Sequence, residues 1–208
     1  MFLLSRWSGG LVGQYGAKLP LIVGPAIAAV GLALFAVPGV GGSYWTTFFP
    51  AVVVLGVGMA ISVAPLTTTV MGAVKTSQAG VASGINNAVA RISGLLSIAV
   101  LSLVVLATFN HSLDRRLEVL KIPPAVQQML NSQRTKLAGA EVPPGLSLEM
   151  TGAIRRAIAE SFVDSFRLVM LVAVVLALAS AIVAFVMIRE QGGKRRGREG
   201  EGGRGRNS

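Results

Sequence analysis

The chain of 208 residues contains no cysteine, which excludes disulfide bonds and thiolate metal sites. Its one histidine, His111, has no second histidine or paired carboxylate at ligand spacing, so we expect no metal site. The sequence also offers no nucleophile–base pair and no phosphate-binding loop. We therefore expect a protein that is not an enzyme and that holds no cofactor.

Acidic residues are the second shortage. Asp and Glu are missing from residues 1–113, and only 13% of the whole chain is charged, against about 25% in soluble domains. The first 113 residues carry four charges, all of them positive: Arg6, Lys18, Lys75 and Arg91. Because a soluble domain cannot bury so apolar a segment, the composition predicts an integral membrane protein whose main partner is the lipid bilayer.

The net charge of +10 raises the possibility of nucleic-acid binding, which the charge distribution argues against. Seven of the nineteen basic residues lie in residues 189–208, directly after an apolar run. That position is typical of the cytoplasmic flank of a membrane helix. A basic stripe that tracks phosphates would need a folded face, and the sequence indicates none there. We expect no nucleic-acid partner.

Four uncharged stretches are each long enough to cross a bilayer, which takes about 17–25 apolar residues. They are Leu19–Pro38, Tyr44–Val74, Ile92–Phe109 and Leu168–Ile188. The second is too short for two crossings and a turn, so we expect one long helix, kinked near Pro65. The predicted fold is an all-α membrane protein with transmembrane helices at about 19–38, 44–74, 79–109 and 167–189.

The remaining segments have different characters. Residues 1–18 look like the stub of a preceding helix followed by a cytoplasmic loop. Residues 190–208 are expected to form a disordered, basic cytoplasmic tail. Residues 110–166 are predicted to form an extracytoplasmic loop with short helices. Ser147 is a possible N-cap there. After Ser147, apolar residues recur every four positions and form a stripe on one helical face: Met150, Ile154, Ile158, Phe162 and Phe166. This stripe either lies on the membrane surface, caps the outer end of the protein, or belongs to a helix that runs into the last crossing.

Polar side chains at the entrance of the third apolar run are the candidate substrate-cavity residues. Asn86 and Asn87 point about 100° apart on a helix, so one of them would bond a neighbouring helix and the other would face a cavity. Arg91 shares a face with Asn87, and it either reaches back to the inner headgroups or lines a substrate path. Met59, in the second run, would suit varied apolar ligands, although such a stripe is more often plain packing.

Small residues at a spacing of four let a neighbouring helix approach closely. In the predicted helix at about 79–109 they form two pairs, Gly80 with Gly84 and Ser93 with Ser97. We therefore expect these four positions to pack against other helices.

The stretch "GVASGINNAVARISGLLSIAV", residues 80–100, resembles the penultimate helix of the fourteen-helix drug:proton antiporter branch of the major facilitator superfamily. Residues 48–74 resemble the helix before it. "GGLVGQYGAK", residues 9–18, is similar to the superfamily's loop motif G-x-L-x-D-R-x-G-R-[RK]. Gly13 and Gln14 stand where that motif has Asp and Arg, whereas four positions match it: Gly9, Leu11, Gly16 and Lys18.

The resemblance implies that the chain is the C-terminal portion of a proton-coupled drug transporter and is inactive alone. The partners would be small amphipathic or hydrophobic solutes and the missing N-terminal half. The location would be the bacterial inner membrane, with both termini cytoplasmic because Lys and Arg flank that side. The alternative is a small four-helix membrane protein with a structural or assembly role.

Overall fold

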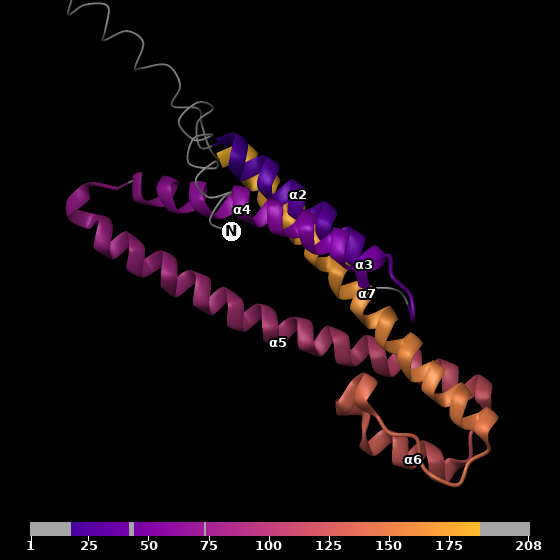
Figure 1. Cartoon of the computed structure of the whole chain (residues 1–208). Coiled ribbons are helices and arrows are strands. Elements are labelled where there is room, and N and C mark those ends of the chain that lie inside the picture. Colours follow the sequence, from indigo (N-terminus) through magenta and orange to yellow (C-terminus); the bar gives the residue numbers. More distant parts are fainter. Residues whose placement is uncertain (1–17, 42–43, 73, 188–208) are drawn as a thin grey trace, which may run out of the picture. The chain divides into compact units, whose positions relative to one another are not determined.

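The computed structural model describes residues 18–41, 44–72 and 74–187, and within them every regular element is a helix (Figure 1). The elements, in chain order, are α2 (Lys18–Ala36), α3 (Tyr44–Thr47), α4 (Phe49–Gly72), η1 (Thr76–Gln78), α5 (Ala79–Leu120), α6 (Pro124–Ser132), η2 (Arg134–Gly139) and α7 (Leu148–Met187). Four of them, α2, α4, α5 and α7, are long and apolar enough to cross a membrane. The predicted fold class, an all-α membrane protein, is confirmed.

The second apolar run forms two helices in place of one. The short α3 ends at Thr47, and α4 begins at Phe49 with Pro50 in its first turn. A proline suits the first turn of a helix, where its missing N–H leaves no hydrogen bond unmade. The backbone stays bonded across the join, because Phe48 N donates to Tyr44 O at 2.9 Å.

The third and fourth runs form helices that extend far beyond their apolar parts. α5 has 42 residues and α7 has 40, about 63 and 60 Å at a rise of about 1.5 Å per residue. A hydrocarbon layer is only about 30 Å thick. Of the three alternatives for residues 148–166, the structure shows the helix that runs into the last crossing. No proline interrupts either helix.

The ends of these extensions follow ordinary capping rules. α5 stops at Leu120, and the next residue, Lys121, has a φ of 48°, the left-handed conformation common after a helix C-terminus. At the start of α7, Ser147 acts as the predicted N-cap, since its Oγ accepts a hydrogen bond from Met150 N at 3.2 Å.

The chain divides into two compact units. Among the described residues, the first unit comprises 18–31, 53–72, 74–83 and 175–187. The second unit comprises 32–41, 44–52 and 84–174.

In the first unit, α2 and α4 cross with almost no side-chain atoms between them. A Cβ added at Gly24 would lie 2.2 Å from Ser62 Oγ, and one at Gly58 would lie 2.4 Å from Ala28 N. One added at Gly31 would lie 2.6 Å from Leu55 N. Only glycine permits such an approach, so these three positions fix the crossing.

In the second unit, α6 packs against the extensions of α5 and α7 (Figure 1). Two members of the predicted stripe, Ile154 and Ile158, are buried there, and Met150 and Phe162 pack against them. The stripe therefore faces a small helical core and does not lie on the membrane surface. The core residues are Phe109, Leu113, Leu117, Ile122, Val126, Leu130, Ile154, Ala157 and Ile158.

Candidate functional site

The three polar candidates at the entrance of the third run lie on the first turns of α5. Asn86 is half-buried, whereas Asn87 and Arg91 are exposed. None of the three side chains forms a hydrogen bond with the described residues. Their assignment to a substrate cavity stays a prediction.

The depth of Arg91 follows from where the helices leave the membrane. The apolar run of α5 ends at Phe109 and that of α7 begins at Leu168, and Ser112 on α5 contacts Asp164 on α7. These two ends therefore lie at one level. Arg91 precedes Phe109 by 18 residues, about 27 Å along the helix. In a hydrocarbon layer about 30 Å thick that begins at Phe109, it would lie a few ångströms inside the opposite edge. From there its guanidinium could reach the headgroups at that edge or line the mouth of a cavity, so both sequence-based alternatives stay open.

The other predicted residues also stay exposed. Met59 on α4 is 46% exposed. A Cβ placed on Gly80 or Gly84 meets no described atom within 4 Å, and Ser93 and Ser97 are exposed on α5. Packing of helices against these four small residues stays a prediction. Of the loop-motif residues, Lys18 begins α2 and lies 4.9 Å from the Phe185 ring centroid, whereas Gly9, Leu11 and Gly16 fall outside the described residues.

Close packing of small residues occurs elsewhere, at Gly24, Gly31 and Gly58. The sequence interpretation missed these positions. The available signal was the spacing of Gly24 and Ala28, which is the same spacing of four that singled out Gly80 and Gly84.

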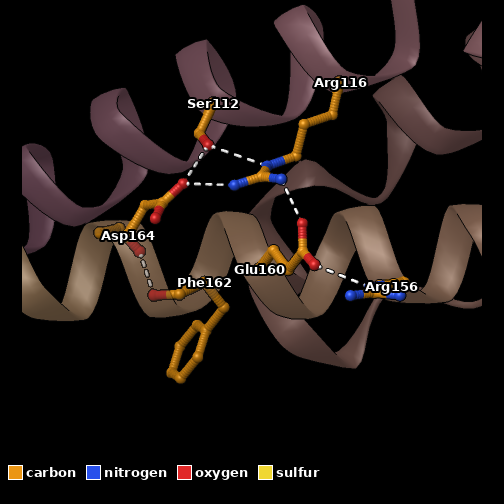
Figure 2. Close-up of polar contacts among 7 residues, drawn as sticks. Ser112, Arg116, Arg156, Glu160, Phe162 and Asp164 are labelled. Carbon is orange, nitrogen blue, oxygen red and sulfur yellow. Dashed lines mark hydrogen bonds and ion pairs between the residues drawn. The ribbon is translucent and has the colours of Figure 1, made fainter. Parts of the chain in front are cut away.

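The sequence interpretation also missed a polar cluster that joins α5 to α7 in the second unit (Figure 2). Arg116 on α5 forms ion pairs with Glu160 and with Asp164 on α7, the latter at 2.9 Å. Ser112 Oγ, one turn earlier on α5, donates to Asp164 Oδ2 at 2.7 Å. Arg156 Nε donates to Glu160 Oε1 at 2.8 Å along α7. Each carboxylate therefore has two donors.

The charge of Asp164 is set by opposing effects. Burial raises its pKa, but hydrogen bonds from Arg116 and Ser112, together with the charges of Arg116 and Arg167, outweigh that effect, so the pKa is lowered. Asp164 therefore stays ionised at neutral pH and acts as a fixed anion. A proton carrier would need a pKa near the working pH instead.

Arg167, one turn beyond Asp164, connects α7 to the end of α2. Its Nη2 donates to Val37 O and to Pro38 O, each at 3.2 Å. An open groove of about 650 Å³ runs along α7 beside these contacts, lined by Gly39, Val40, Arg116, Arg155, Arg156, Ala159, Glu160, Val163, Asp164 and Arg167. Among the described residues, no three His, Cys, Asp or Glu side chains gather to hold a metal ion.

No protein-family model matches the chain. Among curated proteins, it is 30% identical over 182 residues to the multidrug resistance protein Stp of Mycobacterium tuberculosis strain CDC 1551 / Oshkosh. The identity to Stp of strain ATCC 25618 / H37Rv is the same. The alignment covers 82% of this chain and 32% of each relative, so the chain spans about a third of the length of the curated relatives it matches.

Proposed function

We propose that the chain forms the last four membrane-spanning helices of a multidrug efflux transporter of the major facilitator superfamily, in its fourteen-helix drug:proton antiporter branch. The observation that carries the proposal is the similarity to the Stp multidrug resistance proteins, which extends over 82% of the chain. The length agrees, because four helices of fourteen amount to 0.29 of a transporter and the alignment covers 32% of each relative.

Proton coupling in such a transporter would depend on a carboxylate or histidine that titrates within the membrane. The four apolar runs of this chain contain no Asp, Glu or His. Arg91 cannot replace them, because a guanidinium stays protonated at any physiological pH. The proposal therefore assigns this chain to positioning and substrate contact, and assigns proton coupling to the rest of the transporter.

Substrate contact would come from α4 and the start of α5. Asn87 and Arg91 lie four residues apart on one face, and Met59 offers an exposed apolar side chain on α4. In a transporter that rocks about a central site, residues near the inner edge contact the solute as it enters from the cytoplasm. The transported compounds would be small, amphipathic or hydrophobic solutes.

The proposed orientation in the bacterial inner membrane places both termini in the cytoplasm. Lys18, Lys75 and the seven basic residues of 189–208 flank that side of the spans. The extensions of α5 and α7, together with α6, would then lie outside the cytoplasm.

The test measures drug efflux by an intact transporter that contains this segment. Asn87→Ala and Arg91→Ala should each lower efflux by about tenfold or more, because each removes a polar contact made during transport. Val100→Ala, a 57% exposed position on the opposite face of α5 from Arg91, should leave efflux unchanged. Normal efflux in both variants at matched protein levels would remove Asn87 and Arg91 from the site.

A second measurement tests whether proton coupling depends on the rest of the transporter. The chain alone, reconstituted in liposomes with a pH gradient, should drive no solute flux. A flux that depends on the gradient would contradict the assignment of proton coupling to the rest of the transporter.

A further inference from the structure

Three helices that span the membrane meet at one level in the second unit, just beyond their apolar runs. The apolar run of α2 ends in Pro38, that of α5 ends at Phe109, and that of α7 begins at Leu168. Polar contacts join these ends in pairs: Arg167 binds the backbone after α2, and Asp164 binds Ser112 and Arg116 on α5.

We propose that Arg167 is a positioning residue that holds the outer end of α2 against the extensions of α5 and α7. Its guanidinium binds the carbonyls of Val37 and Pro38, so the three helix ends keep one arrangement.

The carbonyls of Val37 and Pro38 lie in the segment that directly follows the C-terminus of α2. α2 ends at Ala36, and the chain then turns through Pro38, which has no N–H, and Gly41, whose φ is 76°. Carbonyls at and just beyond a helix end have no partner within the helix, so a side-chain donor can bind them. A cation also interacts favourably with the negative end of the helix dipole. Arg167 supplies both the donor and the charge.

The support for Arg167 continues through its neighbours. Asp164, one turn earlier on α7, attracts Arg167 electrostatically and is held by Arg116 and Ser112 of α5. Ser165, between them, is fully buried, and its Oγ donates to Phe162 O at 2.8 Å within α7. A path of direct contacts therefore runs from the end of α2 through α7 to α5.

A consequence rests on the proposed function. In a transporter that rocks between two states, the outer ends of α2, α5 and α7 would move as one body, and opening would occur at their contacts with other helices. The experiment below measures the arrangement in the chain itself. Its outcome is therefore independent of whether the protein transports drugs.

The test uses spin labels, which the absence of native cysteine makes site-specific. One pair is placed at Val40 and Val119, which are 53% and 81% exposed, and reports the end of α2 against α5. A second pair at Val119 and Leu148 reports the helical extension alone. The distances between the labels are measured by pulsed electron paramagnetic resonance on the full chain in lipid nanodiscs.

Arg167→Gln removes the charge and the paired donation, and should replace the narrow Val40–Val119 distance peak with a broad distribution. The Val119–Leu148 peak should stay narrow, because that pair does not depend on α2. The matched control is Arg156→Gln, which breaks an exposed contact within α7 and should leave both peaks unchanged.

Three results would overturn the proposal. The first is an unchanged Val40–Val119 peak in Arg167→Gln. The second is equal broadening in the control. The third is broadening of both distances in Arg167→Gln, which would mean that Arg167 maintains the fold of the extension in general and does not position α2.

Discussion

Replacing Gly58 by alanine should separate α2 from α4, because the added methyl group would collide with the backbone of α2. Its Cβ would lie 2.4 Å from Ala28 N and 2.8 Å from Gly24 O, whereas ordinary contact begins at 3.4 Å. The helices must therefore move apart by 3.4 − 2.4 = 1.0 Å at this point. The atoms in the way are backbone atoms, which cannot swing aside as a flexible side chain would.

The magnitude follows from two opposing effects. Overpacking of a close contact costs about 1–3 kcal/mol, and a clash with backbone belongs in the upper part of that range. Alanine is better than glycine within a helix by about 1 kcal/mol. Gly58→Ala should therefore lower the free energy of unfolding by about 1–2 kcal/mol.

Gly56 provides the matched control, because a Cβ added there meets no atom within 4 Å. It lies two residues away on α4, so Gly56→Ala carries the helix benefit without the clash. Its stability should be unchanged or higher by up to about 1 kcal/mol. The two variants should therefore differ by about 1–3 kcal/mol.

The assay is energy transfer between fluorophores on α2 and α4 during titration with sodium dodecyl sulfate. Leu19→Cys and Leu66→Cys provide the labelling sites, because both side chains are about half exposed and the chain has no other cysteine. Loss of transfer reports separation of the two helices. Equal midpoints for Gly58→Ala and Gly56→Ala would refute the reasoning, since the clash would then have no consequence.

Two further predictions concern the second unit. Because the pKa of Asp164 is lowered in the folded protein, its carboxylate stabilises the fold at pH values above the ordinary pKa of an aspartate. This contribution is lost as the pH falls through the lowered pKa, below about pH 4. Asp164→Asn should therefore be less stable than wild type at pH 7, and thermal midpoints should converge on acidification; a constant gap would contradict this. Lys121→Gly should raise stability by up to about 1 kcal/mol, because glycine adopts the φ of 48° without strain, and chemical denaturation of wild type and variant would check it.

The membrane-spanning helices could be predicted from the sequence because a single physical property decides them. Uncharged runs of eighteen residues or more, such as Ile92–Phe109 and Leu168–Ile188, favour hydrocarbon over water whatever their neighbours do. The cap at Ser147 was equally local, since it depends on residues three apart.

The lengths of α5 and α7 were harder to predict, because the end of an apolar run marks the membrane boundary and not the end of a helix. Residues 110–120 and 148–166 are rich in charge, and in a sequence they look like a loop. The structure shows the reason for that charge: one face of each extension is apolar and packs inward, while charged residues such as Arg116 and Glu160 form ion pairs that join the two extensions. The absence of proline was the signal that favoured continuous helices.

The contacts that arrange the helices could not be predicted, because each joins residues far apart in the chain. Gly58 meets Ala28 across α2 and α4, and Arg167 meets Val37 across 130 positions. Periodicity shows which residues share a face but not which helix that face meets. The candidates on α5 illustrate the same limit, since Asn87 and Arg91 have a recognisable pattern and no described partner.

Three acidic residues of the second unit form ion pairs outside the apolar runs. Asp114 forms an ion pair with Arg134, and Glu160 and Asp164 both bind Arg116. These three carboxylates lie beyond the apolar runs, where they fix helices against one another and where a lowered pKa, as at Asp164, suits a permanent anion. A group that carries protons across a membrane must instead lie within it and titrate near neutral pH. In the transporter proposed above, replacing these acids should therefore disturb the helix arrangement and leave the ratio of protons to solute unchanged.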